Sequence, residues 1–296
     1  MTAAAKEFSP RYWTSWLLIG LFRLFTLLPW RLQLGLGRYI GRVARGVARR
    51  RREITRHNLG LCFGDMSEAE RKRLAADHFA SLGIGLIEAA NAWWKSPAWL
   101  RRHMHIEGLE QLEAALGEGR GALLLTAHYT TLEMGAQMLG ISTPTTGVYR
   151  HHENPVFDRV MHAGRLAHGG ELLERGDLRG LLRALRKGST VWFAPDQAYI
   201  GTHSAEVPFF GAPAPTNTAT ARIAAASRAP VLPFHVERLS GSGRYRITIE
   251  PPLQDFPSGD DRADAARVNA VLEAGIRRNP AQYLWSHDRF KHFRRP

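Results

Sequence analysis

The feature that most restricts the fold of this chain is a series of short apolar runs alternating with amphipathic segments. The runs are typical of buried strands and occupy residues 121–127, 145–150, 189–195, 229–238 and 245–253. Between and after them, helical spacing of apolar residues covers residues 132–139, 155–167, 178–187, 216–228 and 262–279. This alternation predicts an α/β fold with a mixed, largely parallel sheet flanked by helices.

A long helix is predicted before this alternating region, over residues 66–100. Its start carries a capping box, in which Ser67 and Glu70 satisfy each other's backbone amides. Apolar residues recur along it at helical spacing, while charged residues crowd its first turns.

The N-terminal segment is strongly apolar. Residues 12–30 read "YWTSWLLIGLFRLFTLLPW" and are interrupted by a single charge, Arg23. The length is near the lower limit for crossing a bilayer, and tryptophans lie near both ends, as interfacial anchors do. An interfacial helix is the main alternative, because Arg23 is costly inside a membrane. A buried core helix is the remaining alternative.

A dense basic segment follows the apolar one, ending in four consecutive arginines at positions 49–52. A cleaved signal peptide would instead carry its charge before the apolar core. We therefore predict a membrane anchor and basic juxtamembrane segment over residues 1–52, and a catalytic domain over residues 53–296. The positive charge places that domain on the cytoplasmic side.

The overall charge indicates an anionic partner. The chain holds 40 Lys and Arg against 27 Asp and Glu, for a net charge of +13. An anionic membrane, an acidic protein or nucleic acid would each fit. No nucleic-acid motif accompanies the arginines, whose position beside an apolar segment suits lipid phosphates, so we expect no nucleic acid. The single cysteine argues against disulfides and a cysteine-rich metal site.

The stretch "LLLTAHYTTLEMG" contains the strongest candidate for chemistry. His128 ends an apolar strand, and reactive groups gather at the carboxyl ends of parallel strands. Side chains five residues apart on one helix point about 140° apart, so Glu133 reaches His128 only if the helix starts between them. Thr130 and Glu133 form such a start as a second predicted capping box. The Glu133 carboxylate then binds either the Thr130 amide or the imidazole, and we expect the imidazole.

A carboxylate on one imidazole nitrogen would make His128 a general base, able to take a proton from a hydroxyl. The sequence has no "GxSxG" nucleophile elbow and no plausible nucleophilic cysteine. Direct attack by an acceptor hydroxyl therefore fits better than a covalent enzyme intermediate. We predict no metal and no cofactor, since His151 and His152 are adjacent and other histidines lack a carboxylate at ligand spacing.

The block "HYTTLE" resembles the His-x4-Asp/Glu motif of the glycerolipid and lysophospholipid acyltransferase superfamily. The whole chain is similar to the late acyltransferases of lipid A biosynthesis, particularly the lauroyl type. The stretches that carry this resemblance are "FSPRYWTSWLL", "RRREITRHNLGLCF", "VYRHHENPVFD", "LRGLLRALRKGSTVWFAPDQAYIG", "VPFFG" and "PAQYLWSHDRFK". They extend from about residue 8 to residue 291.

The resemblance implies transfer of a fatty acyl group from acyl-carrier protein to a hydroxyl of a lipid A precursor, at the bacterial inner membrane. A basic surface would help both the acidic carrier and the phosphorylated acceptor to dock. Acylation of a glycerophospholipid or another glycolipid is the alternative within the superfamily. A noncatalytic peripheral protein that binds anionic lipid is the alternative of another class.

Residue roles follow from the matching positions. His128 is expected to be the general base and Glu133 its orienting partner. Arg165 matches a family arginine and is assigned to acceptor phosphate or to transition-state charge, against the alternative of a solvated helix-face charge. Arg150 ends a strand and is a second phosphate candidate. Asp196 and Gln197 also follow a strand and are assigned to substrate binding, although Asp196 could instead be a turn or N-cap residue.

Overall fold

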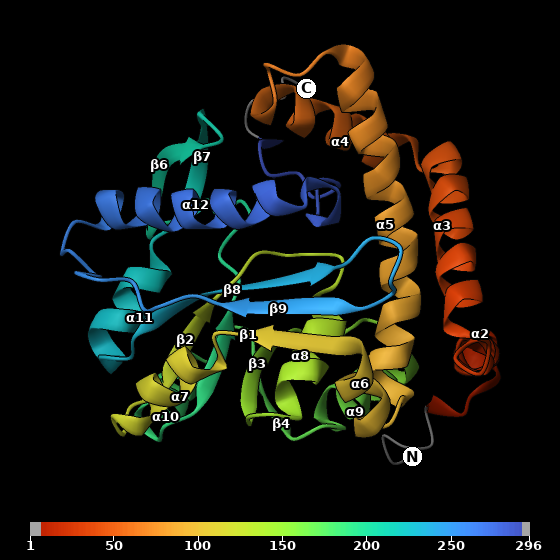
Figure 1. Cartoon of the computed structure of the whole chain (residues 1–296), viewed down its shortest axis with the longest axis horizontal. Coiled ribbons are helices and arrows are strands. Elements are labelled where there is room, and N and C mark those ends of the chain that lie inside the picture. Colours follow the sequence, from red (N-terminus) through yellow and green to blue (C-terminus); the bar gives the residue numbers. More distant parts are fainter. Residues whose placement is uncertain (1–6, 292–296) are drawn as a thin grey trace.

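The computed structural model describes residues 7–291 and is built around a seven-stranded sheet (Figure 1). The strands are β1 (Met104–Glu107), β2 (Ala122–Leu125), β3 (Thr145–Tyr149), β4 (Gly170–Glu174), β5 (Thr190–Phe193), β8 (Val231–Arg238) and β9 (Tyr245–Ile249). Their order is β1-β9-β8-β2-β5-β3-β4. Neighbouring strands are parallel except β8 and β9. The prediction of a mixed, largely parallel sheet is confirmed.

Helices cover both faces of the sheet, as the apolar sequences of its central strands require. Alternate residues of β2 belong to different cores: Leu123 and Leu125 to one, Leu124 to the other. The flanking helices are α7 (Leu109–Gly117), α8 (Leu132–Gly140), α9 (Pro155–Leu166), α10 (Leu178–Arg186), α11 (Ala219–Ser227) and α12 (Asp261–Arg278). Each of the five predicted strands and five predicted helices in this region corresponds to an observed element.

Several elements were not predicted, namely β1, β4, α7 and a separate hairpin of β6 (Ser204–Phe209) and β7 (Ala212–Asn217). The predicted start of a helix at residue 216 was wrong, because Thr216 and Asn217 pair with β6 and α11 begins at Ala219. The prolines of β7 occupy a two-stranded sheet, which tolerates residues without an amide proton.

The long helix predicted before the sheet is divided in two. The Ser67–Glu70 capping box is confirmed at the start of α5 (Glu68–Trp94). The chain then leaves the helix, and α6 (Pro97–His103) starts at Pro97. A proline disfavours helical backbone in the residue before it, which explains the break.

The N-terminal region forms α2 (Trp13–Phe25), α3 (Trp30–Val47) and α4 (Arg49–Cys62). None of the helices within residues 7–291 combines the length and apolarity needed to cross a membrane. The core-helix alternative is wrong, because α2 contains no buried residue. The boundary drawn at residue 52 falls within α4, and the division into anchor and catalytic domain stays a prediction.

Helix α3 runs beside α5 in close backbone contact (Figure 1). A Cβ atom added at Gly41 would lie 2.0 Å from the Phe79 carbonyl oxygen, and one at Gly83 would lie 2.1 Å from the Gly37 oxygen. Only glycine permits this approach. Helix α3, which follows the apolar segment, therefore packs directly against α5.

Candidate active site

His128 lies in the turn between β2 and α8, on the wall of a cleft of about 890 Å³. Its side chain is 28% exposed, so the imidazole is largely buried yet accessible. The cleft opens beyond the carboxyl ends of β2, β5, β3 and β4, where an α/β sheet usually carries its site. The predicted location of His128 at a strand end is confirmed.

Asp196 is the carboxylate that binds the imidazole. Its Oδ1 lies 2.6 Å from Nδ1 of His128, and its Oδ2 accepts the His128 backbone N–H at 3.1 Å. Strands β2 and β5 are parallel neighbours, so the residues that follow them meet at one edge. With Nδ1 donating to Asp196, Nε2 is the nitrogen that can take a proton.

Burial and charge act in opposite directions on this pair. Burial of the imidazole favours its neutral form, but the charge and hydrogen bond of Asp196 outweigh burial, so the pKa of His128 is raised above 6.5. Burial likewise opposes ionisation of Asp196, yet His128 lowers the pKa of that carboxyl below its ordinary value. The pair is therefore arranged to hold an imidazolium beside a carboxylate.

The expectation that Glu133 orients the His128 imidazole was wrong. Its Oε1 accepts hydrogen bonds from Arg165, one from Nε at 3.0 Å and a second from Nη2. Its Oε2 accepts from the Trp93 indole at 3.0 Å. Glu133 thus holds an arginine on α9 rather than the imidazole on its own turn.

The local reason is the position at which α8 begins. The predicted capping box with Thr130 as N-cap was also wrong, because the N-cap is Thr131 and its side chain makes no capping bond. The Thr130 hydroxyl lies 2.7 Å from the Ser81 hydroxyl instead. Glu133 is the second residue of the helix and lies against Trp93 and Arg165.

Four of the predicted substrate-binding or catalytic residues besides His128 line the same cleft: Glu133, Arg150, Arg165 and Gln197. Asp196 is 1% exposed and lies behind His128. The alternative of Asp196 as a simple turn residue is therefore wrong, and so is its assignment to direct substrate contact. Arg165 is not a solvated helix-face charge either, because it pairs with Glu133.

Several contributing residues were missed from sequence. Trp93 donates to Glu133. The charge of Arg175, on the cleft wall, adds to burial in opposing the rise that Asp196 causes in the pKa of His128. Tyr283 is buried beside Asp196; burial first, and then that carboxylate, keep its pKa well above the ordinary value, so it remains a neutral hydrogen-bond donor. The one available signal was the pair of leucines in "ELLE", which directly precedes Arg175 but is too short and too charged to predict a strand.

Within residues 7–291, His, Cys, Asp and Glu side chains form no group of three or more arranged to hold a metal ion.

This arrangement, an α/β sheet with a histidine–carboxylate pair and arginines in one cleft, agrees with the match to known proteins. The chain belongs to the bacterial lipid A biosynthesis acyltransferases, whose family model matches residues 2–292. The family resemblance seen in the sequence motifs is confirmed.

Similar proteins of known activity extend along most of the chain. The lipid A biosynthesis lauroyltransferase of Escherichia coli (strain K12) is 38% identical over 283 residues, covering 95% of this chain and 92% of the relative. The palmitoleoyltransferase of the same organism is 37% identical over 289 residues, covering 97% and 94%. Its myristoyltransferase is 29% identical over 282 residues, covering 93% and 86%.

Proposed function

We propose that the protein transfers a fatty acyl group from an acyl-carrier protein to a hydroxyl of a lipid A precursor that carries Kdo sugars. The observation that carries the proposal is His128 on the wall of a large cleft, with Asp196 bound to its imidazole from behind. The lauroyl, palmitoleoyl and myristoyl transferases among the relatives support a long acyl chain as the group transferred.

In the proposed reaction His128 acts as general base. Its Nε2 removes the proton of the acceptor hydroxyl as that oxygen attacks the thioester carbonyl carbon. Asp196 stabilises the imidazolium formed at this step. The tetrahedral intermediate then breaks its carbon–sulfur bond, and His128 returns the proton to the departing carrier thiol. The products are the acylated lipid and the free carrier protein.

Direct transfer is favoured over an acyl-enzyme intermediate. Cys62, the one cysteine of the chain, is buried on α4, and burial raises its pKa far above that of a free thiol. A thiolate is the nucleophilic form, so Cys62 is unsuited to attack a thioester.

Arg150, Arg165 and Gln197 are proposed to bind the acceptor. All three line the cleft with His128. Guanidinium groups bind phosphate through paired hydrogen bonds, and the acceptor class carries phosphates. Glu133 fixes the direction of Arg165, which orders that guanidinium before the acceptor enters.

The carrier protein is proposed to dock on α10. This helix begins at the cleft wall with Leu178. The helix and the residues just before and after it carry exposed cations, namely Arg175, Arg179, Arg183, Arg186 and Lys187. An acidic carrier would complement these cations and deliver its thioester at the cleft mouth. Charge reversal by Arg179→Glu and Arg183→Glu should raise KM for carrier-bound donor while leaving KM for acyl-pantetheine unchanged. Equal effects on both donors would contradict docking at α10.

The membrane is proposed to contact α2 and α3. Large apolar side chains are exposed in a series along α2, the turn after it and α3, among them Trp13, Leu17, Leu21, Leu24, Leu27, Leu32, Val43 and Val47. Arginines interleave with this series, as in helices that lie in the bilayer interface. In Figure 1, α2 lies at the right of the molecule and α10 at the lower left. The carrier protein and the membrane would therefore contact different sides of the protein. We place the protein on the cytoplasmic face of the inner membrane.

The decisive experiment presents purified protein with carrier thioesters of different chain lengths and a Kdo-bearing lipid A precursor. Mass spectrometry of the acceptor should show one added acyl group and a preferred length. His128→Ala should abolish that product. The proposal fails if the protein acylates lysophosphatidate but not the lipid A precursor, or if His128→Ala retains full transfer.

A further inference from the structure

The turn that carries His128 is held by the C-terminal segment as well as by Asp196. The Leu284 amide donates to the His128 carbonyl at 3.0 Å, and the Thr130 amide donates to the Gln282 carbonyl at 2.7 Å. These bonds attach both ends of the turn to the C-terminal segment. The position of the imidazole therefore depends on what fixes Gln282 and Thr130.

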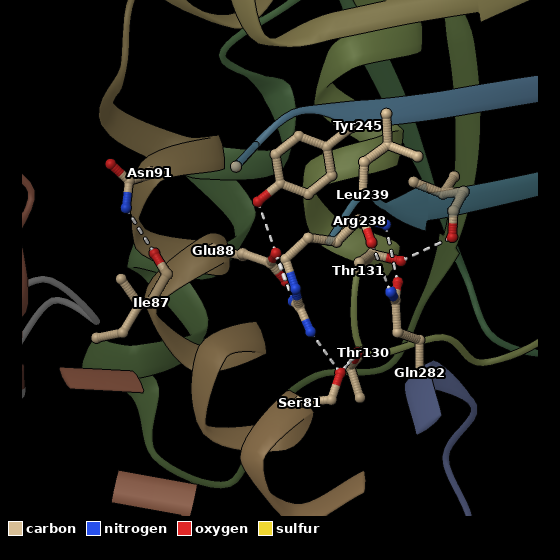
Figure 2. Close-up of polar contacts among 12 residues, drawn as sticks. Ser81, Ile87, Glu88, Asn91, Thr130, Thr131, Arg238, Leu239, Tyr245 and Gln282 are labelled. Carbon is tan, nitrogen blue, oxygen red and sulfur yellow. Dashed lines mark hydrogen bonds and ion pairs between the residues drawn. The ribbon is translucent and has the colours of Figure 1, made fainter. Parts of the chain in front are cut away.

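A buried ion pair lies behind this turn (Figure 2). Arg238, at the end of β8, donates from Nη1 to Oε1 of Glu88 on α5 at 2.6 Å. The Tyr245 hydroxyl donates to the same oxygen at 2.6 Å. Glu88 is 0% and Arg238 8% exposed, so both charges are removed from water.

Two chains of hydrogen bonds connect the ion pair to the turn. In the first, Nη2 of Arg238 donates to the Ser81 hydroxyl at 2.6 Å, and that hydroxyl lies 2.7 Å from the Thr130 hydroxyl. In the second, the Gln282 side-chain amide pairs with the Arg238 backbone, accepting from its N–H and donating to its carbonyl, each at 2.8 Å. Figure 2 shows Ser81 between Arg238 and Thr130, and the Gln282 side chain against the Arg238 backbone.

The physical chemistry favours a positioning role over a purely stabilising one. Replacing a buried ion pair by apolar residues often leaves stability unchanged, so the pair is weak evidence of stabilisation. Its charge-assisted bonds, however, fix α5, β8 and the turn at defined distances. General-base catalysis is sensitive to such distances, since a displacement of about 1 Å can reduce the rate about 10²-fold.

We propose that Arg238, held by Glu88, is a positioning residue for His128 and acts on Thr130 through Ser81 and Gln282. The inference rests on the proposed function of His128 as general base. Arg238 touches neither the substrate cleft nor the imidazole, and its effect passes through the backbone of the turn.

The test is a double-mutant cycle with Ser81→Ala and Thr130→Val. Each variant removes one hydroxyl of the first chain and leaves the Glu88–Arg238 pair intact. We expect each to lower kcat about tenfold or more without raising KM, because neither Ser81 nor Thr130 lines the cleft. The double variant should have the same kcat as either single variant, since the two hydroxyls form one hydrogen-bonded link that either substitution breaks.

Ser227→Ala is the matched control. Ser227 on α11 is a buried serine like Ser81, but its hydroxyl donates to the backbone carbonyl of Ile223, away from the turn. The control should retain wild-type kcat. The positioning role is overturned if kcat falls no further in Ser81→Ala than in Ser227→Ala. It is also overturned if the losses of kcat in Ser81→Ala and Thr130→Val add up in the double variant.

A measurement without substrate separates this inference from the proposed function. The NMR titration of the His128 imidazole should shift to lower pH in Ser81→Ala, because a displaced turn weakens the Asp196 bond that raises the His128 pKa. Ser227→Ala should titrate as wild type. A wild-type protein without transferase activity would overturn the proposed function, whereas an unshifted titration in Ser81→Ala overturns the positioning role. Arg238→Lys, which keeps the charge but cannot span Glu88 and Ser81 together, should match Ser81→Ala in this titration.

Discussion

Nδ1 of His128 lies 2.6 Å from Oδ1 of Asp196, although 68 residues separate them along the chain. The same carboxylate accepts the His128 backbone amide, so it fixes both the ring and its turn. Glu133, five residues from His128, instead pairs with Arg165. The carboxylate that controls the base is thus supplied by the neighbouring strand end and not by the local motif.

Asp196→Asn should change the pH dependence of transfer. A general base must be neutral, so the rate rises with pH through the His128 pKa, which Asp196 raises above 6.5. Without that charge, burial and Arg175 both favour the neutral ring, and the acid limb of kcat/KM should move to lower pH. The rate on the plateau should fall about 10²–10⁴-fold, because the imidazolium loses its partner. An unmoved acid limb would contradict this assignment.

Glu133→Gln should leave the acid limb where it is. Glu133 binds Arg165 and Trp93 and does not touch the imidazole, so its removal does not alter the charge next to His128. The amide still accepts a hydrogen bond but no longer neutralises Arg165, whose guanidinium loses its fixed direction. We expect weaker acceptor binding, measured as a raised KM for the lipid. A limb that moves as far as in Asp196→Asn would restore Glu133 as the partner of the base.

The contrast between these carboxylates marks the limit of sequence reasoning for the site. His128 was placed correctly because an apolar strand ends just before it, and strand ends are visible in sequence. Asp196 was recognised as facing the site for the same reason. Its pairing with His128 depends on β5 lying next to β2, a long-range neighbour relation that no local spacing encodes. Glu133 satisfied the spacing, but the actual helix start turned it toward Arg165.

In the fold, too, some elements were visible in the sequence and others were not. Central strands were predicted because burial on both faces makes them continuously apolar, as in β2. Strands β1 and β4, at the two edges of the sheet, contain only partly exposed and exposed residues and lack that signal. The hairpin of β6 and β7 contains prolines that normally argue against a strand. Position within the sheet therefore decided which strands could be recognised.

Exposed leucines on α2 should be required for membrane binding. Leu17 and Leu24 are 64% and 60% exposed. Burial of a leucine side chain is worth about 1.5–3 kcal/mol, so Leu17→Glu and Leu24→Glu should each weaken binding to anionic phospholipid vesicles at least about tenfold in a sedimentation assay. Leu61→Glu on α4, also exposed, is the control and should bind as wild type. Wild-type binding by the α2 variants would exclude α2 as the contact.

The contact between α3 and α5 should be intolerant of a single methyl group. An alanine Cβ at Gly41 would lie 2.0 Å from the Phe79 carbonyl oxygen, a backbone atom that cannot move aside alone. Gly41→Ala should therefore lower the free energy of unfolding by about 1–3 kcal/mol, the usual cost of overpacking. Gly46→Ala, also on α3, places its Cβ where no atom lies within 4 Å. That control should be neutral or stabilising by up to about 1 kcal/mol, because alanine restricts the unfolded chain and favours helix.

Denaturant unfolding of the full chain measures the free energy of unfolding of both variants. Equal values for Gly41→Ala and Gly46→Ala would contradict the prediction, because α3 and α5 would then accommodate the methyl group without loss of stability.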